Sequence, residues 1–163
     1  MFDEIKFVFF DIDGVLSVPR FNSTESPDNY VTGVSKDKWL QYNINQGDAY
    51  KNCIAPDKVK TLVQTFDYYK KKLYCITVED NSFAYHSKVD FVLRNYPEFA
   101  TMKNILFVSD PLKKVEVITG MMNKVGATVE DCLVIEGSYE SMVYLGSKGL
   151  RTIHISHVLN MDI

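Results

Sequence analysis

Five short, continuous apolar segments constrain the fold of this chain more than any other feature. They cover residues 7–12, 73–78, 105–109, 132–136 and 152–155. A continuous apolar run, without polar alternation, is typical of a strand that is buried on both faces of a sheet. Helical patterns with apolar residues at 3–4 spacing follow between these runs, over residues 57–71, 82–94, 113–125 and 138–148.

Strands and helices that alternate in this way predict a parallel sheet with helices on both faces. We therefore expect an α/β fold, specifically a Rossmann-like, doubly wound three-layer sandwich with a mainly parallel sheet of about five strands. The chain has 163 residues, which suits a single domain spanning 1–163. Residues 17–55 interrupt the alternation with a long polar and aromatic segment. A connection of this length is uncommon in a compact domain, so we interpret it as a cap-like insert or long loop after the first strand.

The first apolar segment runs directly into two aspartates, in the sequence KFVFFDIDGVL. Asp11 and Asp13 follow the strand that is predicted to be the most buried. A buried carboxylate is costly unless a partner offsets its charge. Ligands of doubly wound sheets bind beyond the carboxyl ends of the strands, so the sequence indicates a polar site there. Residues two apart on an extended strand share one side, which favours the pair acting together.

This stretch resembles the first motif of the haloacid dehalogenase-like (HAD) hydrolases, in which an apolar strand ends in Asp-x-Asp-Gly. The other expected pieces follow in order: Thr77 in YCITVEDN, a lysine opening KKVEVITGMMNKVG, and an acidic residue ending the strand of DCLVIEGSYESM. The resemblance covers nearly the whole chain outside 17–55, and it implies a small phosphatase-like member without a large cap domain.

The resemblance also implies a role for each matching residue. Asp11 would be the nucleophile that forms an aspartyl-phosphate, and Asp13 would protonate the leaving oxygen and later deprotonate the attacking water. Thr77 would donate a hydrogen bond to a phosphoryl oxygen. Lys114 is the favoured phosphate-site lysine because its spacing to Gly126 matches the family, and Lys113 is the alternative.

A Mg²⁺ cofactor is implied as well, and here the sequence departs from the family pattern. Asp11 would supply a carboxylate and Asp13 its main-chain carbonyl, since Mg²⁺ prefers oxygen ligands. The family normally adds aspartates in Gly-Asp-x-x-x-Asp or Glu-Asp, whereas this chain reads IEGSYES. Either Glu136 and Glu140 replace both aspartates, or Glu136 matches the Glu of Glu-Asp and Gly137 has lost the metal-binding carboxylate. Glu140 is then either a water-mediated ligand or an ordinary carboxylate at a helix start.

Charge and cysteine usage narrow the expected partners and location. The net charge is −3 and no basic stripe stands out, so a nucleic acid is not expected. No apolar run is long enough to cross a membrane. The three cysteines show no CxxC pair or zinc spacing, which fits reduced thiols in a cytoplasmic protein. An oligomer is compatible with the sequence but not predicted by it.

Together these observations favour a Mg²⁺-dependent phosphohydrolase that acts on a small phosphorylated metabolite through an aspartyl-phosphate. The alternative is a HAD-fold binding or regulatory module with weak or no turnover, in which IEGSYES has lost the metal site.

Overall fold

The computed structural model describes residues 2–19, 50, 53–79, 82–100 and 102–160. Its centre is a five-stranded sheet with the order β5-β4-β1-β6-β7, in which every neighbouring pair is parallel. The strands are β1 (Phe7–Phe10), β4 (Lys72–Val78), β5 (Ile105–Val108), β6 (Cys132–Glu136) and β7 (Arg151–His154). The predicted α/β fold with a parallel sheet is confirmed.

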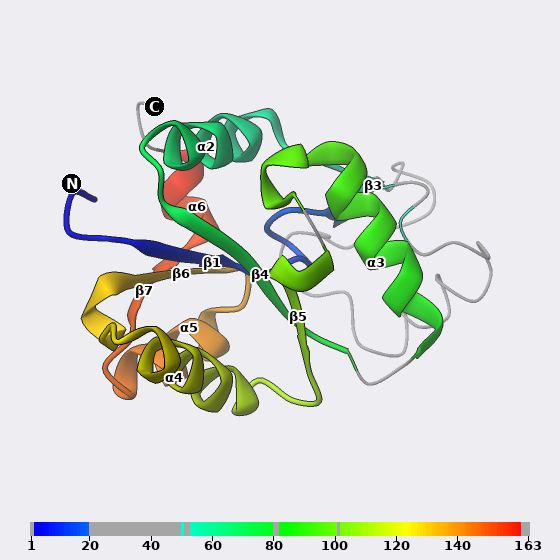
Figure 1. The fold of residues 1–163 in the computed structure, drawn as a ribbon. Coiled ribbons are helices and arrows are strands. Elements are labelled where there is room, and N and C mark those ends of the chain that lie inside the picture. Colours follow the sequence, from blue (N-terminus) through cyan, green and yellow to red (C-terminus); the bar gives the residue numbers. More distant parts are fainter. Residues whose placement is uncertain (1, 20–49, 51–52, 80–81, 101, 161–163) are drawn as a thin grey trace.

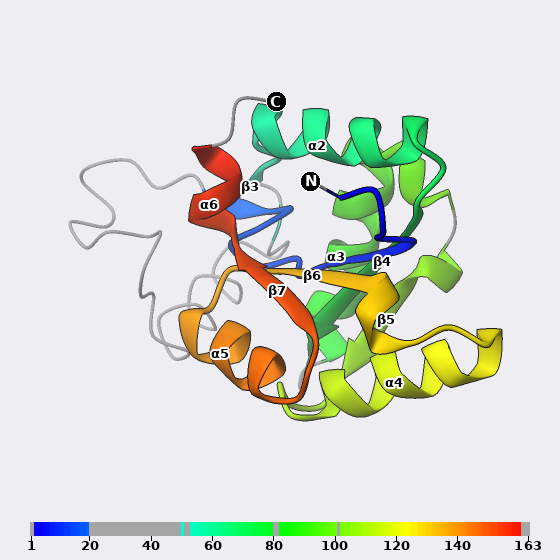
Figure 2. The same cartoon turned by 90° about the vertical axis from the view of Figure 1, so that its left-hand side faces the viewer.

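Helices cover both faces of this sheet (Figures 1 and 2). The helices α2 (Asp57–Tyr68), α3 (Ser82–Asn95) and α6 (Ile155–Leu159) lie on one face, and α4 (Lys113–Val125) and α5 (Tyr139–Ser147) lie on the other. Three short 3₁₀ helices complete the connections: Pro97–Phe99, Met102–Asn104 and Val129–Asp131. Among the α-helices of the described residues, α2, α3, α4 and α5 match the predicted ones within a few residues, and α6 was not predicted.

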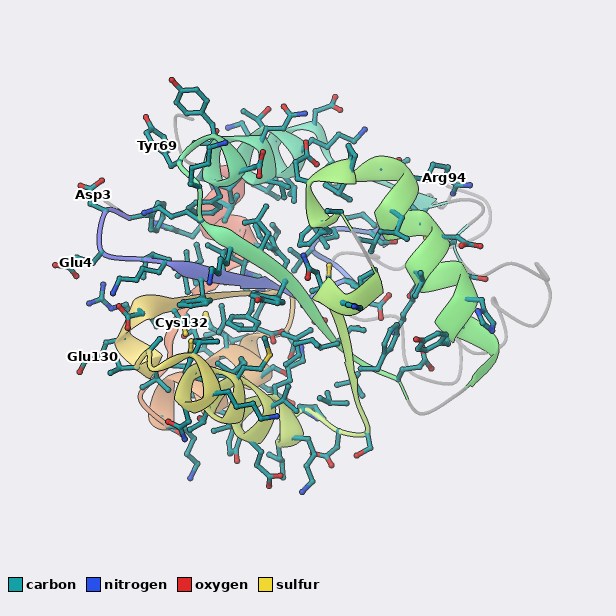
Figure 3. The ribbon with its side chains drawn as sticks, in the orientation of Figure 1. Asp3, Glu4, Tyr69, Arg94, Glu130 and Cys132 are labelled. Carbon is teal, nitrogen blue, oxygen red and sulfur yellow. The ribbon has the colours of Figure 1, made fainter. Side chains whose placement is uncertain are left out.

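Two separate cores show why the strands are continuously apolar. Val8 and Phe10 of β1 pack into the cluster under α2, α3 and α6, whereas Phe7 and Phe9 pack into the cluster under α4 and α5. Alternate side chains of one strand therefore enter opposite layers, and both layers bury apolar side chains. Figure 3 shows that charged side chains such as Glu4 and Glu130 project outward, away from the apolar interior. Both residues precede the amino ends of strands, Glu4 that of β1 and Glu130 that of β6.

The chain reverses its direction of travel across the sheet at β1. It moves from β1 through β4 to β5 on one side, and α4 then carries it back to β6 and β7 on the other side. The carboxyl end of β1 is therefore the switch point where a doubly wound sheet binds its ligands.

The turn after β1 contains Gly14, whose φ of 79° is in the left-handed region that favours glycine. A two-stranded antiparallel sheet follows, formed by β2 (Val18–Pro19) and β3 (Cys53–Ile54). It joins the two ends of the predicted insert 17–55. Most of that insert lies outside the described residues, so its cap-like role stays a prediction. No helix in the described part of the chain is long and apolar enough to cross a membrane.

Candidate active site

Asp11 is the first residue after β1 and lies between the ends of β4 and β6. Its main-chain N–H donates to the carbonyl of Ile135 at 2.9 Å, which continues the pairing with β6. Only 13% of its side chain is exposed. Its Oδ1 atom accepts from the N–H of Ile12 at 2.9 Å. The carboxylate is thus oriented by the backbone turn that follows the strand.

Lys114 brings a buried ammonium group to this carboxylate from the first turn of α4. Its Nζ atom lies 3.2 Å from Asp11 Oδ1 and 2.7 Å from Glu136 Oε1. Burial lowers the pKa of Lys114, but the charges of Asp11 and Glu136 outweigh it and raise the pKa overall. The ammonium therefore stays protonated. Lys113, the alternative from the sequence, is exposed and pairs with Glu116 at 2.9 Å.

Glu136 ends β6 and is completely buried. Burial and the neighbouring charge of Asp11 raise its pKa to about 8, although Lys114 acts in the opposite direction. Its second oxygen, Oε2, has no hydrogen-bond partner among the described residues. A buried carboxylate oxygen without a partner is unfavourable, so this position suits a proton or a cation.

A second lysine, Lys88 of α3, organises the other half of the site. Its Nζ atom lies 2.9 Å from Asp13 Oδ2 and 3.0 Å from Glu79 Oε2. It also donates to the carbonyl of Val78 at 2.8 Å and lies 3.4 Å from Thr77 Oγ1. Burial lowers the pKa of Lys88, and the charges of Asp13 and Glu79 more than compensate, so the pKa is raised.

Asp13 receives a donor on each carboxylate oxygen. Lys88 contacts Oδ2, and the hydroxyl of Tyr50 donates a short hydrogen bond to Oδ1. Burial and the charge of Asp13 raise the pKa of Tyr50 well above its ordinary value, so the phenol stays protonated and donates. The Asp13 side chain is still 38% exposed to solvent.

Gly137 packs directly against the main chain that follows β1. A Cβ atom at this position would lie 2.9 Å from the carbonyl oxygen of Asp13 and 3.3 Å from the carbonyl carbon of Gly14. Those atoms belong to the backbone, so they cannot move aside easily. The carbonyl of Gly137 lies 3.1 Å from Nε2 of His154. The close approach explains why glycine occupies this position.

The structure brings most of the predicted site residues together. Asp11, Lys114 and Glu136 form one cluster, and Asp13 and Thr77 meet around Lys88. Glu140 is the exception, because its side chain is exposed in the first turn of α5. The roles of these residues as nucleophile, acid–base group and ligands stay predictions.

The sequence reasoning missed Lys88, Glu79 and Tyr50. A signal for Lys88 was present, because it shares a helix face with the apolar residues Ala84 and Phe91. A lysine within an apolar stripe is rarely buried without a partner. Tyr50 lies at the end of the insert, where no periodicity pointed to it. The aromatic and polar residues of the insert between positions 20 and 49 lie outside the described residues.

The donor chemistry of the site fits a hard divalent cation. Four carboxylates (Asp11, Asp13, Glu79, Glu136) face two ammonium groups (Lys88, Lys114), which leaves two negative charges when all are ionised. Within the described residues, no three His, Cys, Asp or Glu side chains converge as a metal-binding group. The available donors are the carboxylates of Asp11 and Glu136 and the carbonyl of Asp13. This set suffices for Mg²⁺, which is commonly held by one or two carboxylates and keeps several waters.

Several solved structures with a similar fold are HAD family proteins. A HAD family hydrolase from Deinococcus radiodurans, determined with bound phosphate and sodium, is 17% identical with a TM-score of 0.58, over 93% of this chain and 80% of that one. A HAD family enzyme from Bacteroides thetaiotaomicron, a magnesium complex, is 15% identical with a TM-score of 0.55, over 98% of this chain and 100% of that one. A HAD hydrolase from Entamoeba histolytica is 14% identical with a TM-score of 0.58, over 97% and 90% of the two chains.

No protein-family model and no curated protein matches the sequence. At these identities the likeness concerns the fold. The chain has the fold of the HAD-like hydrolases.

Proposed function

We propose that this protein is a Mg²⁺-dependent phosphohydrolase that cleaves a small phosphorylated metabolite through an aspartyl-phosphate on Asp11. The observation that carries the proposal is the buried cluster of Asp11, Lys114 and Glu136 at the end of β1. A carboxylate can attack an anionic phosphate ester only where positive charge offsets the repulsion. Lys114 supplies one such charge at the nucleophile itself.

The metal would be held by the carboxylates of Asp11 and Glu136 and the carbonyl of Asp13. When bound, Mg²⁺ would neutralise the charge of the phosphoryl oxygens. Gly137 leaves one position of the usual ligand pattern without a carboxylate, and water is the natural substitute there.

The chain's own residues then divide the reaction into two steps. In the first, a carboxylate oxygen of Asp11 bonds to phosphorus and the ester P–O bond breaks, while Asp13, which enters this step in its protonated form, gives that proton to the leaving oxygen. In the second, Asp13 takes a proton from water, which attacks the phosphorus, and the Asp11 carboxylate leaves with inorganic phosphate as the product. Thr77, buried at the end of β4, would donate its hydroxyl to a phosphoryl oxygen.

A reducing compartment suits the chain, and we propose a cytoplasmic location. Cys75 and Cys132 are free and buried. Burial raises the pKa of both thiols, that of Cys132 to about 11, so neither is a reactive thiolate. The proposed partner is a small phosphorylated molecule rather than a nucleic acid or a membrane.

A HAD-fold binding or regulatory module is the second candidate. Two observations favour it: Gly137 carries no carboxylate, and Glu140 is exposed rather than directed at Asp11. In this case the site would bind a phosphorylated ligand without turning it over.

Hydrolysis of an aryl phosphate, with and without Mg²⁺, separates the two candidates. We expect Mg²⁺-dependent phosphate release by the wild type and loss of that release in Asp11→Asn. Asp67→Asn removes the same charge from exposed surface of α2 and should behave as wild type. Thermal denaturation with added Mg²⁺ gives an independent readout of binding. Wild-type protein that is stabilised by Mg²⁺ and phosphate but releases no phosphate from any ester would favour the binding module.

A further inference from the structure

Lys88 connects Asp13 to the end of strand β4 in the central sheet. Its ammonium has three donors, and three acceptors lie within 3.0 Å of it: Asp13 Oδ2 at 2.9 Å, the Val78 carbonyl at 2.8 Å and Glu79 Oε2 at 3.0 Å. Val78 and Glu79 belong to the end of β4, a central strand of the sheet. Lys88 itself is 3% exposed and lies on α3 between the buried residues Ala84 and Phe91. Two of its three contacts thus fix the ammonium to the sheet.

The third contact acts on a side chain that lacks such support. Asp13 lies on the turn after β1, and 38% of its side chain is exposed. Without partners, its carboxylate could rotate about χ1 and χ2 among several staggered arrangements. Lys88 and Tyr50 bind different oxygens of this carboxylate, and two donors on different atoms define the plane of the group.

Thr77 relates the orientation of the Asp13 carboxylate to the proposed phosphate-binding position. Its hydroxyl lies 3.4 Å from the same ammonium, so Lys88 lies between the residue proposed to hold the phosphoryl group and the residue proposed to move the proton. The distance from Asp13 to a bound leaving group therefore depends on Lys88.

We propose that Lys88 is a positioning residue for proton transfer, and that it holds the Asp13 carboxylate at the leaving oxygen of the substrate. Glu79 acts one step further away by fixing the ammonium of Lys88 in place. The inference rests on the proposed phosphohydrolase function and adds residues to it that no sequence motif indicated. It concerns orientation, so it predicts a specific defect rather than a general loss of activity.

The defect should depend on the leaving group. An alkyl phosphate releases a basic alkoxide that needs a proton in the transition state, whereas 2,4-dinitrophenyl phosphate releases a weakly basic phenolate that needs none. Misplacing an acid–base group by about 1 Å costs on the order of 100-fold. We expect Lys88→Met to lower kcat for an alkyl phosphate by roughly 10- to 100-fold more than kcat for the dinitrophenyl ester. KM for both esters should change little, because Thr77, Lys114 and Asp11 are intact.

Three further variants calibrate this comparison. Asp13→Asn removes the group itself and sets the largest leaving-group discrimination that can be reached. Lys88→Arg restores a cation with several donors and should recover part of the alkyl-phosphate activity. Lys103→Met removes an exposed lysine outside the site and should match the wild type on both esters.

Folding is controlled separately, because Lys88→Met removes the cation that Glu79 contacts at 3.0 Å. The double variant with Lys88→Met and Glu79→Gln also removes the negative charge of Glu79 and should show the same leaving-group defect. Equal losses on the two esters in folded Lys88→Met protein, or in the folded double variant, would overturn the positioning role and leave the proposed function intact. Wild-type protein without activity on either ester would overturn the proposed function and, with it, this inference.

Discussion

Lys114 and Glu136 form an ion pair at the end of β6, with 2.7 Å between Nζ and Oε1, in which both side chains are almost fully buried. The same ammonium reaches Asp11 at 3.2 Å. One cation therefore offsets two carboxylates that the sheet forces into the interior. The pair is expected to govern both the stability of the metal-free protein and the charge at the proposed nucleophile.

Lys114→Met should destabilise the protein. Removing one partner of a buried pair leaves an uncompensated charge, which costs about 3–5 kcal/mol. We expect a loss of roughly 3 kcal/mol in the free energy of unfolding, at the lower end of that range, because Glu136, whose pKa is raised to about 8, can carry a proton. Urea denaturation followed by circular dichroism measures this. Lys113→Met, at the exposed neighbouring position, should change the midpoint little, and equal midpoints for the two variants would contradict the buried pair.

Stability in EDTA should fall as the pH rises toward 8. Glu136 has a folded-state pKa of about 8 against an ordinary value of 4.5, so the folded protein binds this proton more tightly than the unfolded chain. A raised pKa contributes stability that is complete below about pH 4.5 and is lost as the pH rises through about 8.

The Glu136→Gln variant isolates that contribution. Its free energy of unfolding between pH 5 and 8 should vary less steeply than that of the wild type, since glutamine does not titrate. Glu130→Gln, at an exposed position, should keep the wild-type slope. A wild-type slope in Glu136→Gln would show that Glu136 is already ionised across this range.

Gly137→Ala should distort the backbone of the site. The new Cβ atom would lie 2.9 Å from the carbonyl oxygen of Asp13, and overpacking of this kind costs roughly 1–3 kcal/mol. Gly120→Ala in the interior of α4 meets no atom within 4 Å and should stabilise the protein by about 0.5–1 kcal/mol. Opposite shifts in the melting temperature are the expected result, and a stabilised Gly137→Ala protein would refute the close approach.

Tyr96→Phe should weaken the attachment of the turn after β1 to the helical layer. The Tyr96 hydroxyl donates to the carbonyl of Leu16 at 2.6 Å, and the tyrosine is completely buried. Leaving that carbonyl without its donor costs about 1–3 kcal/mol. Tyr69 is 64% exposed at the end of α2 (Figure 3), so Tyr69→Phe is the matched control and should have the wild-type denaturation midpoint. Equal midpoints for the two variants would contradict the buried hydrogen bond.

Local sequence patterns were sufficient to predict those helices and strands whose type depends on neighbouring residues in the chain. Apolar runs such as 132–136 can be satisfied only between two helical layers, and β6 covers those same residues. The helix predicted over 113–125 is α4 without any shift, because Gly126 adopts a φ of 68° and ends it. The predicted helix 57–71 ends earlier, at Tyr68, since Lys70 turns into the left-handed region with a φ of 59°, which residue type alone did not indicate.

The sequence by itself determined that Asp11 and Asp13 stand at the end of a buried strand. Charged residues that directly follow an apolar run are least costly at the carboxyl end of a strand, where they leave the apolar interior of a parallel sheet. Only the tertiary structure decided which lysines meet them. Lys114 rather than Lys113 faces Asp11, because the first turn of α4 directs one lysine inward and the other to solvent. Lys88 and Tyr50 reach Asp13 from positions 75 and 37 residues away, a distance over which no periodicity carries information. Packing of α3 and of Tyr50 against the sheet brings these residues to Asp13. The contacts are favourable because they offset the charge of a partly buried carboxylate.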